Sequence, residues 1–220
     1  MNNSFAIVTD SNGLSNKECA IKDTWVFRIL KRLSEKKYVG YTFLIRSLTS
    51  KDILNFRGLK NDLFSGEYQK VILSFGIVDC SPRVLPRWIL YSLRERKYFK
   101  YTINLINKKL LPIFSRYLTY QWINRKEFKE NILLMKKMAE SNEVYLFFTP
   151  IPPASSRLKE KMTGIEKIID NYNEVFLECK VDLIPVNWSE NANEYFIFDG
   201  YHLNPKGHSL LVESIFNHVI

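Results

Sequence analysis

The chain has few of the residues that form disulfide frameworks and metal centres. It contains three cysteines, Cys19, Cys80 and Cys179, and only three histidines among its 220 residues. The cysteines are odd in number and too far apart to form a zinc or redox motif, so we expect three reduced, buried thiols in a cytoplasmic protein. No metal ion and no organic cofactor is expected.

The sequence also lacks long apolar runs, internal repeats and low-complexity stretches. No apolar run approaches the roughly 18 residues that a membrane-spanning helix needs. The first residues, Met-Asn-Asn-Ser-Phe-Ala-Ile-Val, carry no basic start and no cleavage-site pattern, which favours a first strand over a signal peptide. With 46% hydrophobic and 25% charged residues and no linker, residues 1–220 are expected to fold as one domain.

Positive charge is concentrated in one stretch of the sequence. The formal net charge is +9, yet residues 83–129 alone hold twelve Lys and Arg against two Glu, so the rest of the chain is close to neutral. This stretch also holds ten aromatic residues and is longer than a connection between two strands requires. We interpret it as a basic, aromatic, helical insertion.

Three interpretations of residues 83–129 stay open. The insertion could pack on the sheet with a solvated basic face, or it could form a lid or cleft wall that binds an anionic glycan or a lipid-linked precursor. It could also rest on the anionic inner face of a membrane, where each basic residue contributes about 1 kcal/mol. Nucleic acid is the other common polyanion, but the sequence has no zinc module and no RNA-binding motif, so nucleic acid is not an expected partner.

Short apolar runs alternate with segments of helical periodicity along the chain. Strands alternating with helices predict a parallel sheet covered on both faces. The predicted fold class is therefore α/β, a flavodoxin-like three-layer α/β/α sandwich with a central parallel sheet of about five strands. The expected strands are 5–9, 41–45, 70–75, 143–149 and 181–186, and the expected helices are 14–36, 128–141, 161–179 and 205–218.

Polar or small residues follow the first three strands at the same edge of this sheet. Ser11 follows the first strand, Ser47 the second and Gly76 the third. In open parallel sheets, ligands bind where the carboxyl ends of the strands meet. A loop with Asp199 and His202 reaches the same edge just before the last helix, so we expect a single site there.

These residues match the needs of a serine nucleophile. A free serine hydroxyl is a weak nucleophile near neutral pH, so it needs an imidazole to accept its proton and a third group to orient that imidazole. Ser11 is the expected nucleophile, His202 the general base and Asp199 its partner. Taken alone, Ser11 could instead cap a helix, and Asp199 and His202 could form a loop ion pair. The three together favour catalysis.

Three blocks of the sequence resemble those of the SGNH (GDSL-type) hydrolases. They are Thr9-Asp10-Ser11, Gly76-Ile77-Val78-Asp79 and Asp199-Gly200-Tyr201-His202, against the family's Gly-Asp-Ser, Gly-x-Asn-Asp and Asp-x-x-His. The resemblance runs from Phe5 to the C-terminus, with the blocks in the family's order and spacing. It implies the family's fold, its triad and an oxyanion hole made by the serine N–H, a block-two glycine N–H and a block-three asparagine side chain.

The oxyanion hole departs from the family's pattern at two positions. Ser47 stands where the second block usually has glycine, and Val78 stands in place of the asparagine. A backbone N–H can still donate from Ser47, whereas a valine side chain cannot donate. We expect the N–H groups of Ser11 and Ser47, with support from the Gly76 loop, to hold the oxyanion, with each well-placed donor contributing about 3–4 kcal/mol.

The third block continues into Asp79-Cys80-Ser81-Pro82-Arg83, and we assign Asp79 and Arg83 to substrate binding. The planar guanidinium of Arg83 can donate two hydrogen bonds to a carboxylate or a phosphate. The alternative is that Arg83 pairs within the fold, for example with Asp79. Gly-Ile-Val-Asp-Cys followed by Pro-Arg also resembles family variants from bacterial surface-polysaccharide synthesis clusters.

The resemblance implies a serine esterase. We expect it to remove acyl groups, O-acetyl in the first place, from a carbohydrate or another small ester through an acyl-enzyme. One alternative is an O-acyltransferase that passes the acyl group to a surface-polysaccharide precursor. The other is a degenerate, non-catalytic glycan-binding domain, for which Val78 and Ser47 are the support.

Overall fold

A computed structural model describes residues 4–94 and 120–220, and its strands form one parallel sheet. The strand order is β2-β1-β3-β4-β5, and every neighbouring pair is parallel. The predicted α/β fold with a central parallel sheet of about five strands is therefore confirmed. The strands are β1 (Ser4–Thr9), β2 (Val39–Leu44), β3 (Lys70–Ser74), β4 (Tyr145–Phe148) and β5 (Asp182–Leu183).

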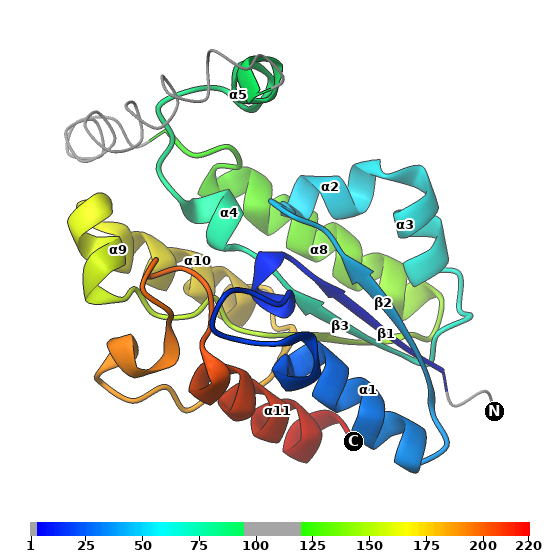
Figure 1. Ribbon diagram of the computed structural model, residues 1–220. Coiled ribbons are helices and arrows are strands. Elements are labelled where there is room, and N and C mark those ends of the chain that lie inside the picture. The colour runs from blue at the N-terminus through cyan, green and yellow to red at the C-terminus, as the bar shows by residue number, and fades with distance from the viewer. Residues whose placement is uncertain (1–3, 95–119) are drawn as a thin grey trace.

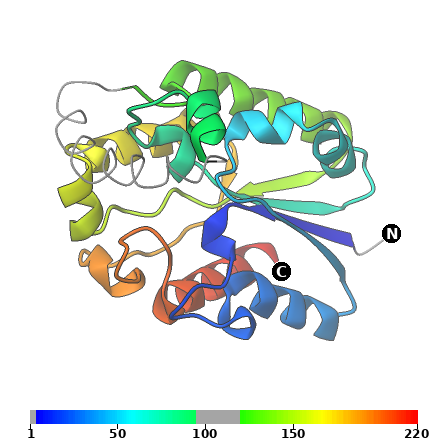
Figure 2. The ribbon, with the colours of Figure 1, turned by 45° about the horizontal axis from the view of Figure 1, so that its top comes forward.

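Helices cover both faces of the sheet, as Figures 1 and 2 show. One face is covered by α1 (Trp25–Glu35) and α11 (Pro205–Val219), which also contact each other. The other face is covered by α2 (Ser50–Asn55), α3 (Arg57–Leu63), α8 (Arg125–Ser141) and α10 (Ile165–Glu178). Three shorter helices are α4 (Ile77–Cys80), α5 (Arg87–Arg94) and α9 (Ser156–Lys161).

The apolar composition of each strand follows from its place in the sheet. Residues 5–8 of β1 have no exposed surface, because this strand lies inside the sheet with helices on both sides. Strand β2 lies at the edge and keeps Val39 and Tyr41 exposed. The continuous apolar run of β1 is therefore the sequence signature of a doubly covered strand.

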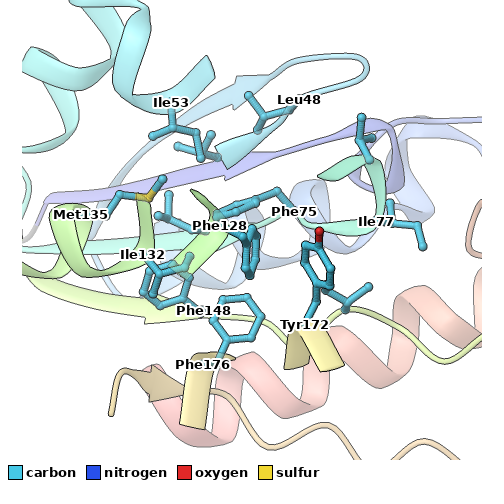
Figure 3. Close-up of a cluster of buried hydrophobic side chains, with 14 of the residues drawn as sticks. Leu48, Ile53, Phe75, Ile77, Phe128, Ile132, Met135, Phe148, Tyr172 and Phe176 are labelled. Atoms are coloured by element: carbon cyan, nitrogen blue, oxygen red, sulfur yellow. The ribbon is translucent and has the colours of Figure 1, made fainter. Parts of the chain in front are cut away.

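The larger core lies between the sheet and helices α8 and α10, and its centre is aromatic (Figure 3). The ring of Phe128 lies 5.0 Å from that of Tyr172 and 5.6 Å from that of Phe176, measured between centroids. The hydroxyl of Tyr172 donates to the carbonyl of Ile123 at 2.6 Å, so its polar end is satisfied. Each fully buried Phe stabilises the fold by roughly 1.5–3 kcal/mol, which fixes this side of the sheet as a rigid support.

Several predicted boundaries are wrong, and each has a local cause. The helix expected over 14–36 begins only at Trp25, where the hydroxyl of Thr24 accepts from the N–H of Phe27 and caps it. The helix expected from residue 161 begins at Ile165, after Gly164 at φ +78°. The strand expected over 181–186 is confined to β5, which pairs with β4 through only two residues.

The basic insertion predicted over 83–129 is described only at its ends. Its first part contains α5, its last part enters α8, and residues 95–119 lie outside the described residues. The lid, glycan-contact and membrane-contact interpretations therefore stay predictions. Among the described helices, none is both long enough and apolar enough to cross a membrane.

Candidate active site

The loops after β1, β2 and β3 meet at one edge of the sheet. The N–H of Ile45 donates to the carbonyl of Thr9 at 3.0 Å, and the N–H of Asp10 donates to the carbonyl of Ser74 at 3.2 Å. These bonds continue the strand register past the last paired residues. The residues that follow the three strands are thus held side by side.

Ser11 stands at the start of a single 3-10 turn, Ser11–Gly13, directly after β1. The carboxylate of Asp10 accepts from the N–H of Asn12 at 2.8 Å and caps this turn. Gly13 packs so closely that an added Cβ would lie 2.2 Å from Cγ2 of Thr9. The turn is therefore a tight unit that fixes the position of the Ser11 hydroxyl.

Asp10 supports this turn from inside the protein. Its side chain is 1% exposed, and burial raises its pKa to about 6, although the hydrogen bond from Asn12 and the nearby His202 oppose that rise. Asp10 thus stabilises the turn that carries Ser11.

Asp199 and His202 are joined directly in the loop before α11. Oδ2 of Asp199 lies 2.6 Å from Nδ1 of His202. Oδ1 of Asp199 accepts from the N–H groups of Tyr201 and His202 at 2.8 and 2.9 Å. Gly200, at φ +76°, allows the chain to turn between the two side chains.

These contacts set the protonation and orientation of the pair. Burial alone would raise the pKa of Asp199, but the hydrogen bonds from His202 and Tyr201 outweigh it and lower the pKa to about 2. The ionised carboxylate accepts the Nδ1–H of His202, which leaves Nε2 as the basic nitrogen. This is the tautomer that a general base needs.

Ser11 and His202 line the same open cleft, which has a volume of about 830 Å³. Asp199, Arg46 and Phe198 also line it. Within the described residues no hydrogen bond joins Ser11 to His202, and catalytic hydrogen bonds of this kind often tighten only when substrate is bound. The structure therefore brings the three predicted catalytic residues to one cleft.

The backbone at the predicted oxyanion positions keeps the conformation of glycine. Ser47 has φ +56°, in the left-handed region that favours glycine, and Gly76 has φ +118°. An added Cβ at Gly76 would lie 2.7 Å from the side chain of Ile151. Within the described part of the chain, no acceptor is bonded to the N–H of Ser11 or of Ser47. Ser11 lines the cleft and Ser47 follows Arg46, which also lines it, and the role of their N–H groups in an oxyanion hole stays a prediction.

Replacing Ser47 with glycine is expected to stabilise the fold and to preserve activity. A left-handed backbone costs a non-glycine residue about 1–2 kcal/mol. Glycine avoids this cost, but it loses more conformational entropy on folding, which offsets part of the gain. The Ser47→Gly protein should therefore gain about 0.5–1 kcal/mol in unfolding free energy, measured by urea denaturation. Ser47→Pro, which has no N–H and a fixed negative φ, should lose both stability and activity.

Asp79 is buried and is not among the residues that line the cleft of Ser11 and His202, so its assignment to substrate binding stays a prediction. Its side chain has no exposed surface, and Oδ1 accepts from the N–H and the hydroxyl of Ser50 at 2.9 and 2.6 Å. Asn131 donates to the same hydroxyl at 2.9 Å, so the carboxyl ties α4 to α2 and α8. Burial raises its pKa to about 7 despite these hydrogen bonds.

This raised pKa predicts a pH-dependent stability. An ordinary aspartate ionises near 3.8, so between about pH 4 and pH 7 the folded chain holds a proton at Asp79 that the unfolded chain has lost. Asp79 should therefore lower the unfolding free energy as pH rises through this range, by at most about 1.4 kcal/mol per pH unit, and Asp10, whose pKa is also raised, should add to that fall. Thermal denaturation of Asp79→Asn, which cannot ionise, should show a shallower dependence than the wild type or the exposed control Asp170→Asn. Parallel curves for all three proteins would contradict the assignment.

Arg83 lies outside the cleft that Ser11 and His202 line. Its guanidinium carbon lies 4.4 Å from the centroid of the Trp122 ring, and its backbone N–H donates to the carbonyl of Tyr120. No ion pair joins Arg83 to Asp79 in the described part of the chain. Its role in substrate binding stays a prediction.

Sequence reasoning missed Arg87, which supports the block-two loop from α5. Arg87 pairs with Asp52 at 2.7 Å and also donates to the carbonyl of Ser47 at 3.4 Å. Asp52 in turn accepts from the N–H of Thr49 and completes a capping box at the start of α2. Only the Thr-x-x-Asp pattern of that box was visible in the sequence.

The cysteines take no part in this site. All three are buried and free, as expected. Burial raises the pKa of the Cys80 thiol, which makes it a poor nucleophile. Among the described residues, no group of three or more His, Cys, Asp or Glu side chains is placed to hold a metal ion.

Comparison with known proteins gives matches in structure but not in sequence. No family model and no curated protein matches the sequence. A lipase/acylhydrolase from Enterococcus faecalis is 17% identical with a TM-score of 0.63, covering 98% of this chain and 94% of that chain. The acetylxylan esterase Axe2 from Geobacillus stearothermophilus is 12% identical with a TM-score of 0.61, covering 98% and 93%.

A third similar structure carries the name of the family whose blocks the sequence resembles. It is a protein from Desulfitobacterium hafniense assigned to the lipolytic G-D-S-L family, 14% identical with a TM-score of 0.59, covering 99% of this chain and all of that chain. At these identities the likeness establishes a shared fold along nearly the whole chain. That fold is the parallel α/β fold that these lipase and esterase structures also have.

Proposed function

We propose that this protein is a serine esterase of the SGNH (GDSL) type with Ser11, His202 and Asp199 as its catalytic triad. The observation that carries the proposal is the 2.6 Å contact between Asp199 and His202 in a cleft that Ser11 also lines. Such a pair beside a serine on a tight turn activates the serine hydroxyl. The fold shared with esterases and lipases supports the same activity.

The first half of the reaction forms an acyl-enzyme. Oγ of Ser11 attacks the ester carbonyl carbon while Nε2 of His202 takes the hydroxyl proton. Asp199 stabilises the imidazolium that results, and the N–H groups of Ser11 and Ser47 stabilise the negative carbonyl oxygen. When the tetrahedral intermediate collapses, the bond to the alcohol oxygen breaks and His202 returns the proton to the leaving alkoxide.

The second half regenerates the enzyme. Water attacks the acyl carbon while His202 takes one of its protons, and the second tetrahedral intermediate releases the acid as the proton returns to Ser11. Because Val78 occupies the position of the usual asparagine donor, two backbone donors carry the oxyanion. We therefore expect a lower kcat on simple esters than a three-donor site would give.

We propose an O-acylated carbohydrate as the substrate class, with O-acetyl as the acyl group. The cleft is open, and its lining combines apolar residues with the polar side chains of Asn16, Lys17 and Arg46. These three side chains can form hydrogen bonds with the hydroxyls of a sugar. The Axe2 structure, which has a similar fold, is that of an acetylxylan esterase, and this supports the choice of substrate class. The setting we propose is surface-polysaccharide synthesis in the cytoplasm.

Release of acetate from an acetylated xylooligosaccharide tests the proposal. Acetate formation that depends on the protein supports an esterase. If acetate appears only slowly while the acetyl group is recovered on an added, unacetylated sugar, the acyl-enzyme is passed to a hydroxyl and the protein is an acyltransferase. Failure to cleave this substrate, ethyl acetate or p-nitrophenyl acetate would contradict esterase activity and would favour the non-catalytic interpretation.

A further inference from the structure

Phe198 is an aromatic side chain held open to solvent beside the catalytic pair. It precedes Asp199 directly, is 75% exposed and lines the same cleft as Ser11 and His202. A single exposed apolar residue is common on protein surfaces and by itself indicates nothing. Phe198 differs from such residues because other parts of the protein hold its ring in place.

A guanidinium group supports the ring of Phe198. The guanidinium carbon of Arg157 in α9 lies 3.5 Å from the ring centroid, a stacking contact. Arg157 is itself half-buried. One side of the phenyl ring is therefore occupied within the protein, while most of the ring surface stays exposed.

The loop that carries Phe198 is hydrogen-bonded to both ends of α9. The hydroxyl of Ser155 donates to the carbonyl of Gly200 at 3.0 Å, and Nζ of Lys161 donates to the carbonyl of Asp199 at 2.6 Å. An added Cβ at Gly200 would lie 2.6 Å from Oγ of Ser155 and 3.1 Å from Cβ of Arg157. Figures 1 and 2 both place this orange loop beside α9. The ring is thus held in place before any ligand arrives, which lowers the entropy cost of binding.

We infer that Phe198 forms the alcohol subsite of the cleft and stacks against the sugar ring of the substrate. This inference rests on the proposed esterase function. A pyranose ring has an apolar face of C–H groups and hydroxyls around its edge. The C–H face would lie on the phenyl ring, and the hydroxyls would form hydrogen bonds with the side chains of Asn16, Lys17 and Arg46, which line the cleft.

Phe198 thereby selects the alcohol part of the ester and leaves the acyl part to the loops around Ser11. The ring belongs to the loop of the general base, and His202 must protonate the oxygen of that alcohol as it leaves. A sugar stacked on the Phe198 ring, which serves as a platform, would have its leaving oxygen within reach of the imidazole.

Two acetate esters that differ only in the alcohol test this inference. The ratio of kcat/KM for a mono-O-acetylated methyl xylopyranoside to that for ethyl acetate should fall about five-fold in Phe198→Ala. Phe198→Tyr, which keeps the ring, should retain most of that ratio. Phe27→Ala removes an exposed phenyl from α1, outside the cleft, and should leave the ratio unchanged. An unchanged ratio in Phe198→Ala would overturn the inference while the esterase assignment stands.

A second measurement separates failure of the subsite from failure of the enzyme. Reaction with a small fluorophosphonate reports on Ser11 alone, and binding of methyl xylopyranoside, followed by saturation-transfer NMR, reports on Phe198 alone. A sugar signal that weakens in Phe198→Ala supports the platform whether or not the serine reacts. Equal signals in the two proteins, or no signal in either, contradict it.

Discussion

Replacing Ser11 with alanine is expected to lower kcat for ester hydrolysis by roughly 10⁴-fold or more. The substitution removes the oxygen that attacks the carbonyl, and within the described residues no other hydroxyl shares the tight turn after β1 with it. The turn itself should persist, because Asp10 caps it through the N–H of Asn12 and not through the serine side chain. Initial rates of acetate release, together with circular dichroism to confirm folding, measure the effect.

Ser141→Ala is the matched control for this loss. Ser141 is an exposed serine at the end of α8, and among the described residues its hydroxyl donates only to the carbonyl of Lys137. Its replacement should leave kcat close to that of the wild type. A Ser11→Ala protein that retained a tenth or more of the activity would show that another group forms the acyl-enzyme.

Removal of the imidazole at position 202 is expected to cost about as much as removal of the nucleophile, roughly 10⁴-fold in kcat. His202 must take the proton of Ser11 and later deliver it to the leaving alcohol, and an alanine side chain can do neither. Asp199→Asn should cost at least about 10²-fold, because an amide no longer stabilises the imidazolium and no longer enforces the tautomer. The pKa of Asp199, about 2, means that the carboxylate is ionised throughout the pH range of an esterase assay.

The double variant gives the clearest sign that the residues act as one unit. Ser11→Ala combined with His202→Ala should be no slower than Ser11→Ala alone, since an imidazole without a nucleophile contributes nothing. A further loss of ten-fold or more would mean that His202 has a role independent of Ser11. Steady-state rates of the two single variants and the double variant decide between these outcomes.

The sequence was sufficient for the sheet and for the residues that gather at its edge. The apolar run of β1 has the signature of a doubly covered strand, and parallel strands must bring the segments after them to one edge. The pairing of Asp199 with His202 follows from their spacing around Gly200. These features depend on local pattern and on topology, both of which can be read along the chain.

Features that depend on contacts between distant parts of the chain could not be predicted from the sequence. Helices α2, α3 and α4 are short and carry little periodicity, so their formation depends on caps and on packing against the sheet. The ion pair of Arg87 with Asp52 joins residues 35 positions apart. The burial of Asp79 against Ser50 is likewise invisible in the sequence, where a carboxylate beside a conspicuous arginine reads as a binding residue.

The glycine-like backbone at Ser47 illustrates a partial success. The block comparison placed this serine where glycine is usual, and the structure gives it φ +56°. Local residue preference would not have predicted this conformation, because serine seldom adopts it. The backbone at Ser47 thus has the left-handed conformation that glycine favours, while the role of its N–H as an oxyanion donor stays a prediction.

Labelling with a fluorophosphonate probe, followed by mapping of the labelled peptide, tests the central claim most directly. Such probes form a covalent bond only with a serine whose hydroxyl is activated by a neighbouring base. We expect the wild-type protein to be labelled on Ser11, Ser11→Ala to stay unlabelled, and His202→Ala to react far more slowly. A wild-type protein that stays unlabelled, or one that carries the label on another serine, would contradict this claim.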